Sequence, residues 1–192
     1  MNIIHTPIAG LLVLEPKVFY DVRGWFSESF NEQTFNTVVG NNPITHTPYT
    51  FVQDNHSCSY KGVLRGLHYQ LPPFAQGKLV RVIQGVVWDV SVDIRKGSPT
   101  FGQWYGIELS ADNNKQLWIP PGFAHGFITL SETAQFLYKT TALYNKSSEG
   151  TIVWNDTDIN ITWPTMNCDI VVNEKDNNAS KLLDLTDNNL FN

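Results

Sequence analysis

The sequence contains few charged residues. Asp, Glu, Lys and Arg together make up 16% of its 192 residues, against roughly a quarter in an average soluble domain. Thirteen are basic and 18 are acidic, which gives a net charge of −5. A nucleic-acid-binding protein needs a basic surface to neutralise the phosphate backbone. We therefore do not expect nucleic-acid binding.

Long apolar runs and paired cysteines are also absent. No stretch approaches the roughly 20 apolar residues of a membrane-spanning helix, and residues 1–10 lack the basic start and apolar run of a secretory signal. The two cysteines, Cys58 and Cys168, are far apart and form no Cys-x-x-Cys motif. We expect a cytoplasmic protein with two reduced thiols and no membrane contact.

Apolar and aromatic residues are plentiful. Hydrophobic residues make up 42% of the chain and aromatic residues 12%, enough to form one sizeable core without disulfides. The length is close to the roughly 100 to 200 residues of one domain, and no repeat or low-complexity segment interrupts it. We predict a single domain spanning residues 1–192.

Alternation of polar and apolar side chains dominates the first 164 residues. In residues 87–94, polar Asp89, Ser91 and Asp93 alternate with apolar residues, which predicts a half-buried strand. Residues 79–83 predict the strand before it, and Gln84-Gly85 predicts a hairpin turn between the two. Further strands are predicted at 13–18, 51–55, 105–109, 116–119, 126–130, 135–141, 151–154 and 159–163. Many short strands separated by Gly, Pro and Asn predict a β-sandwich or barrel.

Helical segments are few in this sequence. Asn31 is a suitable N-cap for a helix that runs to about residue 38 and is ended by Gly40. A second short helix is predicted within residues 179–190. The polar, Asn-rich residues 167–178 are by composition alone a loosely held tail.

Several polar side chains fall on strands where they could line a cavity. Gln53 and Asn55 share one face of a strand, which is either a ligand-facing wall or a solvated face. Arg65 and His68 would point to opposite faces unless Gly66 forms a bulge, because glycine tolerates the backbone that a bulge requires. A histidine satisfied by a core hydrogen bond is the alternative for His68. Lys78 begins the next strand, where a lysine is normally solvated.

The segment Pro120-Pro121-Gly122-Phe123-Ala124-His125 matches the second motif of the cupin barrels, which presents a histidine to the barrel interior. The first cupin motif normally supplies His-x-His and a Glu as metal ligands, but here it reads His68-Tyr69-Gln70. Two histidines are fewer than the three or so protein ligands of a catalytic metal. We therefore expect a barrel without a metal. Tyr138, taken alone, is an aromatic residue of the core.

Six segments together resemble the dTDP-4-dehydrorhamnose 3,5-epimerase family: residues 21–24, 52–55, 64–68, 77–81, 119–126 and 136–139. They occur in the family's order and spacing, and the resemblance extends through Trp163-Pro164. It implies an all-β, cupin-type jelly-roll barrel or sandwich with a few short peripheral helices. It also implies a homodimer that needs no metal or cofactor and acts on a dTDP-4-keto-6-deoxy sugar.

The resemblance assigns a catalytic role to four residues. The family inverts carbons 3 and 5 of dTDP-4-keto-6-deoxyglucose to give dTDP-4-dehydro-L-rhamnose, and each carbon is next to the ketone, so a base and an acid must flank the sugar. His68 is similar to the base, Tyr138 to the acid and Lys78 to the lysine beside the ketone oxygen. Asp176 is similar to the aspartate that pairs with the base, and this requires residues 165–192 to fold back over the barrel.

Substrate contacts are implied for a larger group of polar residues. Arginine and lysine side chains suit the pyrophosphate of a nucleotide sugar. Aromatic residues in the region 24–26, supplied by the partner subunit, would cover the thymine. The residues implied are Arg23, Glu28, Gln53, Asp54, Asn55, Arg65, Lys78, His125, Glu149 and Lys175.

Three alternatives are left open by the sequence. A related enzyme could invert only carbon 3 or only carbon 5, or isomerise the keto group, on the same barrel. A sugar-binding jelly roll without catalysis is the non-enzymatic alternative, and a metal-dependent cupin is the third. The presence of His68, Lys78 and Tyr138 together favours the epimerase.

Overall fold

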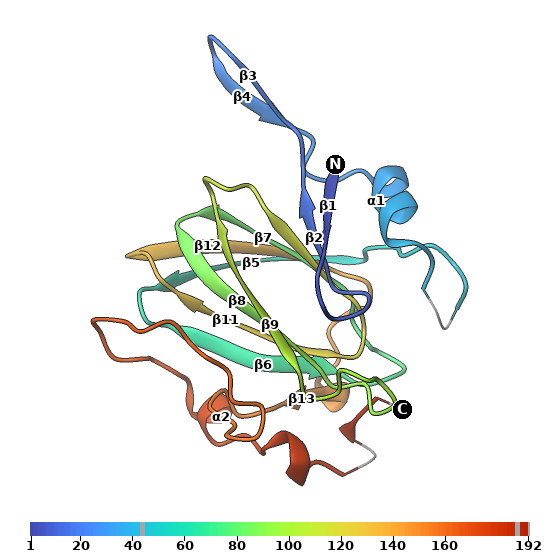
Figure 1. The fold of residues 1–192 in the computed structure, drawn as a ribbon, viewed down its shortest axis with the longest axis vertical. Coiled ribbons are helices and arrows are strands. Elements are labelled where there is room, and N and C mark those ends of the chain that lie inside the picture. Colours follow the sequence, from blue (N-terminus) through green and yellow to red (C-terminus); the bar gives the residue numbers. More distant parts are fainter. Residues whose placement is uncertain (43–44, 187–188, 192) are drawn as a thin grey trace.

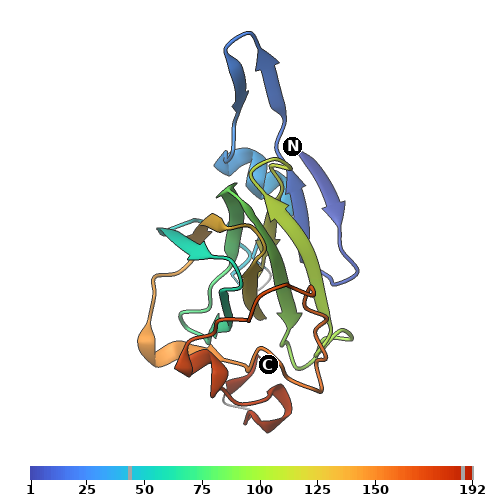
Figure 2. The ribbon, with the colours of Figure 1, turned by 90° about the vertical axis from the view of Figure 1, so that its left-hand side faces the viewer.

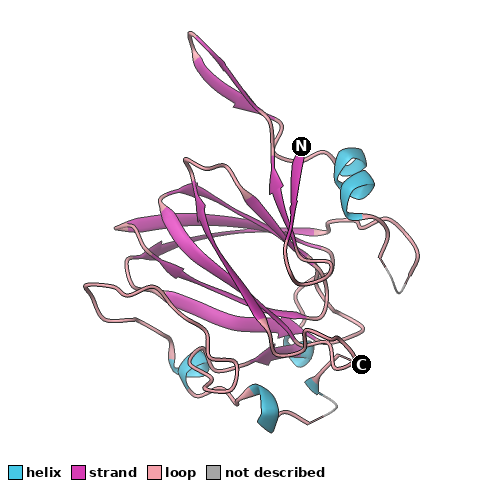
Figure 3. Ribbon diagram, viewed as in Figure 1, coloured by secondary structure: helices cyan, strands magenta, loops and turns pink. Residues whose placement is uncertain are grey.

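β-Strands are the main regular structure of the protein, and the helices are short and peripheral (Figure 3). The computed structural model describes residues 1–42, 45–186 and 189–191. None of the helices in these ranges has the length and apolar character needed to cross a membrane. The predicted all-β class is confirmed.

Two antiparallel sheets face each other (Figure 1). The six-stranded sheet has the order β1 (Asn2–His5), β2 (Leu12–Glu15), β10 (Gln116–Ile119), β7 (Lys78–Gln84), β12 (Thr133–Thr140) and β5 (Gln53–Tyr60). The five-stranded sheet has the order β13 (Glu149–Thr151), β6 (Leu64–Gln70), β11 (Phe123–Thr129), β8 (Val86–Asp93) and β9 (Trp104–Ser110). From β5 to β8 and from β10 to β12, consecutive strands lie in alternate sheets. This connectivity is that of the predicted jelly roll.

The connection between β7 and β8 differs from the predicted hairpin. Gly85 has φ +78° and forms a tight turn, but β7 and β8 lie in different sheets and do not pair. The turn therefore takes the chain from one sheet to the other. Local turn chemistry predicts the turn, but it does not tell which strands become neighbours.

Strand β8 is buried on both faces, so the prediction of a half-buried strand is wrong. Asp89, Ser91 and Asp93 are fully buried. Their face of the strand is also that of Val87, which belongs to the core between the sheets. On the other face, Val92 belongs to a second core cluster, which contains residues 182, 190 and 191. The polar side chains of this strand thus point into the barrel, as Val87 does, whereas Trp88, Val90 and Val92 point outward.

The C-terminal segment covers the outer face of the five-stranded sheet. Leu182, Leu190 and Phe191 pack there, and bridges join Val63 to Val171 and residue 95 to 191. Figures 1 and 2 show this segment lying beside β6. Residues 167–178 are not a loose tail, because they contain the one-turn helix α2 (Glu174–Asn177), capped by Asn173.

Several predictions of secondary structure in this part of the chain were wrong. The helix predicted in 179–190 is a single 3-10 turn, η2 (Leu182–Asp184), and residues 187–188 lie outside the described ranges. The strand predicted at 159–163 is absent from the described structure, and the one predicted at 151–154 is the shorter β13, which starts earlier, after η1 (Lys146–Ser148). Isolated contacts, such as the bridge between Ile152 and Ser180, replace regular pairing here.

Two N-terminal elements lie outside the barrel. Helix α1 (Glu32–Val39) is capped by the Asn31 side chain, which accepts from Thr34 N at 3.0 Å, as predicted. Its Phe35 packs edge-on against Trp118 on the outer face of the six-stranded sheet, with ring centroids 5.0 Å apart. The hairpin of β3 (Val18–Asp21) and β4 (Gly24–Ser27) projects away from both sheets (Figures 1 and 2).

Candidate active site

The first site residues are brought together by a bulge in β6. His68 lies opposite His125 on β11, and Arg65 lies opposite Phe127. The chain therefore advances three residues along β6 where it advances only two along β11, which is the register shift of a bulge. Gly66 permits this with φ +138°, and a Cβ added there would lie 2.5 Å from the Cα of Gly126. The bulge predicted at Gly66 is confirmed, and it places Arg65 and His68 on one cavity.

His68 is paired with Asp176, a residue 108 positions later in the chain. His68 Nε2 lies 2.7 Å from Asp176 Oδ1, and Gly66 N donates to Asp176 Oδ2 at 3.0 Å. Asp176 is fully buried, and its backbone N donates to Asn173 Oδ1. Burial acts to raise the pKa of Asp176, but the hydrogen bond and charge of His68 and the Gly66 N–H lower it by more. Asp176 is therefore an ionised acceptor that leaves Nδ1 as the unoccupied nitrogen of the dyad.

Lys78 at the start of β7 is buried, with 8% of its surface exposed. Its Nζ donates to the carbonyl oxygen of His68 at 3.2 Å. Burial lowers the pKa of Lys78 to about 8, while the charges of Asp89 and Glu149 act in the opposite direction. A lysine at a strand start is normally solvated, but this one is a cation inside the barrel that loses its proton near pH 8.

His125 forms a second buried pair, with Asp89 on β8. His125 Nε2 lies 2.9 and 3.1 Å from the two carboxylate oxygens of Asp89. Burial lowers the pKa of His125, helped by the charges of Lys78 and His68 and opposed by Asp89. Asp89 was not identified as a site residue from the sequence. The feature that could have indicated Asp89 is the polar face of the strand at 87–94. In a half-buried strand, that face is the solvent-exposed one.

Tyr138 on β12 faces the same cavity from the opposite sheet. It lies opposite Asn55 on β5 and Val80 on β7, and its ring centroid is 6.1 Å from that of Phe136. Burial raises the pKa of Tyr138, with Arg65 acting in the opposite direction. Its hydroxyl is therefore protonated at neutral pH and able to donate.

A cavity of about 300 Å³ between the sheets contains these side chains. His68, on the five-stranded sheet, and Tyr138, on the six-stranded sheet, both line it. Of the residues predicted from the sequence, the cavity is lined by Asn55, Arg65, His68, Lys78, His125 and Tyr138.

Other predicted residues lie beside this cavity rather than on it. Glu149 forms an ion pair with Lys175, with Lys175 Nζ and Glu149 Oε2 2.6 Å apart. Gln53 Nε2 donates to Asn55 Oδ1 at 2.9 Å. Asp54 is on the opposite face of β5 from these two, where it pairs with Lys139 at 3.0 Å. Asp54 therefore does not reach the cavity of its own chain.

Arg23 and Glu28 are not among the residues that line this cavity either. Arg23 is at the turn of the β3–β4 hairpin, is exposed and is ion-paired with Asp21. Glu28 follows β4 and accepts from Asn31 Nδ2 at 3.4 Å. Neither side chain lines the cavity.

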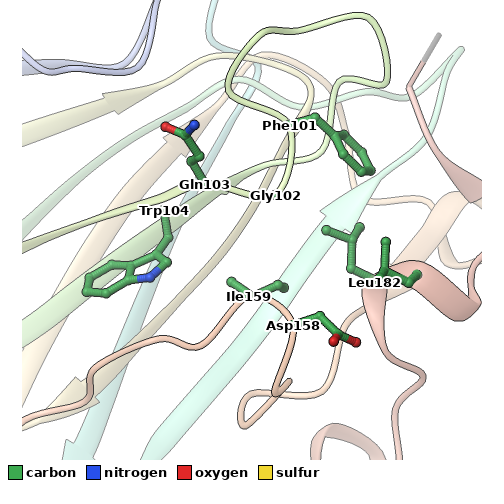
Figure 4. Close-up of a pocket in the computed structure, with 8 residues that line it drawn as sticks. Phe101, Gly102, Gln103, Trp104, Asp158, Ile159 and Leu182 are labelled. Atoms are coloured by element: carbon green, nitrogen blue, oxygen red, sulfur yellow. The ribbon is translucent and has the colours of Figure 1, made fainter.

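A second depression of about 570 Å³ lies beside β9 and contains none of the predicted site residues (Figure 4). It is lined by the loop around Phe101, by Trp104, and by Asp158, Ile159 and Leu182. It is larger than the cavity between the sheets but has no pair of titratable groups able to act as acid and base. We therefore assign the chemistry to the interior cavity.

In the part of the chain that the structure describes, no three or more His, Cys, Asp and Glu side chains are grouped as metal ligands. Two of the three histidines that line the cavity have Nε2 next to a carboxylate, His68 with Asp176 and His125 with Asp89, whereas His56 Nε2 lies 3.0 Å from Gln135 Oε1. The expectation of a metal-independent reaction stays a prediction.

A base paired with a buried carboxylate, an acid across from it and a cation between the two sheets define a proton-transferring isomerase on a jelly-roll barrel. Residues 5–184 match the family model described as dTDP-4-dehydrorhamnose 3,5-epimerase. The chain belongs to this family.

Individual relatives agree with the family match. The dTDP-4-dehydrorhamnose 3,5-epimerase of Salmonella typhimurium is 62% identical over 164 residues, 85% of this chain and 86% of the relative. That of Shigella flexneri is 56% identical over 184 residues, 96% and 97% of the two chains. A crystal structure of a dTDP-6-deoxy-D-glucose-3,5-epimerase from Legionella pneumophila, in complex with dTDP-4-keto-L-rhamnose, superposes with a TM-score of 0.92 and 47% identity. The match covers 99% of this chain and 97% of that one. The predictions of family, cupin-type fold and epimerase activity are confirmed.

Proposed function

We propose that this protein inverts carbons 3 and 5 of dTDP-4-keto-6-deoxyglucose to give dTDP-4-dehydro-L-rhamnose, a step of dTDP-L-rhamnose biosynthesis. The observation that carries the proposal is that His68 and Tyr138 line one cavity from opposite sheets. Inversion at a carbon requires removal of a proton from one face of the sugar and its return to the other. The two side chains are arranged for such a transfer.

His68 is the base in this mechanism. Because Asp176 occupies Nε2, the proton from carbon 3 or carbon 5 passes to Nδ1, and the electron pair of the broken C–H bond delocalises onto the ketone oxygen as an enolate. Asp176 then stabilises the imidazolium that forms. The dyad thus sets the orientation of the base.

Lys78 and Tyr138 complete each inversion. The Lys78 ammonium stabilises the oxyanion of the enolate, a charge that is present mainly in the transition state and intermediate, so it acts on rate more than on binding. The Tyr138 hydroxyl returns a proton to the opposite face of the carbon. Solvent then reprotonates the tyrosinate and takes the proton from His68, so the enzyme is unchanged.

The remaining predicted residues are assigned to substrate binding. Asn55, Arg65 and His125 line the cavity, where they would contact the sugar and the adjoining phosphate. Gln53, Glu149 and Lys175 lie beside it and would hold the nucleotide. Arginine and lysine provide the charge-assisted bonds that a pyrophosphate requires.

We propose that the protein is a homodimer, because the projecting β3–β4 hairpin exposes five large apolar side chains: Phe19, Tyr20, Val22, Trp25 and Phe26. Exposed apolar surface of this kind marks an interaction site. In a dimer the hairpin would carry Arg23 and Glu28 toward the partner's cavity, and Asp54 would face the partner.

The dimer is tested by light scattering of the purified protein and of the double variant Trp25→Ser, Phe26→Ser. We expect the mass of two chains for the wild type, and the mass of one chain with a raised KM for the variant. The variant Tyr60→Ser, which changes an exposed residue at the end of β5, is the control. A monomeric, fully active wild type would refute the proposal.

We also propose a cytoplasmic location. Cys58 and Cys168 are both exposed and unpaired, a state that a reducing compartment preserves. Cell fractionation with an antibody should find the protein with cytoplasmic markers, and recovery in a secreted fraction would contradict this.

Deuterium incorporation tests the reaction. With dTDP-4-keto-6-deoxyglucose in D₂O and no added cofactor, NMR should show exchange at carbons 3 and 5, and His68→Ala should lose both. Exchange at one carbon would favour a 3-epimerase or 5-epimerase, and migration of the keto group a ketoisomerase. Binding without exchange would favour a sugar-binding jelly roll. Full activity after exhaustive chelation would exclude a metal-dependent reaction.

A further inference from the structure

The Asp89–His125 pair lies inside the barrel and has no role in the proton transfers described above. Asp89 is fully buried on β8, and both of its carboxylate oxygens lie within 3.1 Å of His125 Nε2. His125 itself lines the cavity together with His68 and Lys78. A buried carboxylate is costly unless it has partners, so its position calls for an explanation.

We infer that Asp89 is a positioning residue for the epimerase reaction, which fixes one tautomer of His125 and supplies the buried negative charge that keeps Lys78 protonated. The inference deepens the proposed function and rests on it, because it concerns the charge state of the group beside the ketone oxygen. Asp89 acts through two other side chains and is not itself in contact with the cavity.

The effect on His125 follows from the hydrogen bond. A carboxylate only accepts, so the proton of His125 is on Nε2, which faces Asp89. Burial lowers the pKa of His125, so the ring is neutral at neutral pH and its Nδ1 is unprotonated. A neutral ring of this tautomer accepts a hydrogen bond from a sugar hydroxyl and cannot donate to an oxyanion through Nδ1. Lys78 is then the cation that stabilises the enolate.

The effect on Lys78 follows from the charges around it. The titratable and charged groups around it come from six strands: His56 on β5, Arg65 and His68 on β6, Asp89 on β8, His125 on β11, Tyr138 on β12 and Glu149 on β13. The two carboxylates are those of Asp89 and Glu149, and Glu149 is already paired with Lys175 at 2.6 Å. Asp89 is completely buried and faces a neutral histidine. Asp89 is therefore the main counter-charge for the buried ammonium of Lys78.

The variant Asp89→Asn tests this through the pH profile of kcat. In the wild type we expect kcat to fall above about pH 8, as Lys78 loses its proton. Without the charge of Asp89, the fall should begin about one pH unit lower or more, with kcat on the acid side retained to within about tenfold. Lys78→Arg should show no such fall in either background, because arginine does not titrate in this range.

A matched control is Asp93→Asn. Asp93 is equally buried on the same face of β8, but its carboxylate bonds to Arg95, Ser98 and Thr100 in a turn. It should lose stability and keep the wild-type profile. A folded Asp89→Asn variant with the wild-type profile would refute the inference.

A measurement on the wild type does not depend on the folding of any variant. The ¹⁵N chemical shifts of the His125 ring should report a proton on Nε2 and none on Nδ1 at pH 7. A proton on Nδ1 with Nε2 bare would overturn the inference. This outcome is distinct from failure of the proposed function, which is shown by absence of deuterium exchange at either carbon in the wild type.

Discussion

Replacing Asp176 with asparagine removes one negative charge from the dyad while keeping the size of the side chain. The carboxylate accepts from His68 at 2.7 Å and from Gly66 N at 3.0 Å in a fully buried position. A hydrogen bond to a charged group contributes roughly 1.5–3 kcal/mol, and about 1.4 kcal/mol is a factor of ten in rate. Loss of the bond that stabilises the imidazolium therefore slows proton removal by about tenfold to a hundredfold.

The tautomer adds to this loss. In the Asp176→Asn variant, the side-chain amide nitrogen would donate to His68 Nε2 and move the ring proton to Nδ1, the atom that has to accept the proton of the sugar. We therefore expect deuterium exchange at carbons 3 and 5 to fall together by about a hundredfold or more, measured by NMR at saturating substrate. A smaller change in KM is expected, because Asp176 does not line the cavity.

Asp156→Asn is the control for the loss of a buried carboxylate. Asp156 accepts from Leu182 N at 2.7 Å and from Asp158 N at 2.8 Å and has no histidine partner. Its replacement should lower the free energy of unfolding by about 1–3 kcal/mol and leave kcat unchanged in the folded fraction. A folded Asp176→Asn variant with wild-type exchange at both carbons would refute the assignment of the dyad.

Three further predictions concern the cavity. Gly66→Ala should destabilise the protein by more than about 2 kcal/mol, because φ is +138° and the new Cβ would lie 2.5 Å from Gly126 Cα. The control Gly97→Ala has open space around the new Cβ and should unfold in urea like the wild type. Equal urea midpoints for the two variants would contradict the argument. Tyr138→Phe should keep exchange of at least one proton with solvent but produce little inverted sugar by NMR, and normal inversion would show that another group is the acid. Lys78→Met should lower kcat by about 10²-fold to 10³-fold with little change in KM in steady-state assays, whereas a change in KM alone would assign Lys78 to binding.

Features that depend on neighbouring residues were predictable from the sequence. The start of the helix after Asn31 was predictable because an Asn side chain caps its first turn, which is a local contact. The bulge at Gly66 is also local, because only glycine fits its backbone angle and the close approach of β11. The positions of the motif histidines His68 and His125 on their strands were predictable from the same local patterns.

Features that depend on distant residues were not predictable in this way. The turn at Gly85 is evident in the sequence, but whether β7 and β8 pair depends on competition among all the strands. Asp176 lies in a polar segment with no apolar period, so composition alone assigned it to a loose tail. Only the family resemblance placed it near His68, because the contact joins residues 108 positions apart.

The face of a strand that turns inward cannot be decided from the alternation of polarity alone. Burial of a charge is unfavourable unless a partner of opposite charge or a set of hydrogen bonds compensates for it. In β8 that compensation comes from other strands. His125 on β11 bonds to Asp89, and the charge of Asp89 acts to raise the pKa of Lys78 on β7. The apolar face of β8 can turn outward because the C-terminal segment covers it. Asp89 therefore points inward because its partners on other strands compensate for its burial. The polar face of a strand becomes evidence for a site only when matching partners on other strands point toward it.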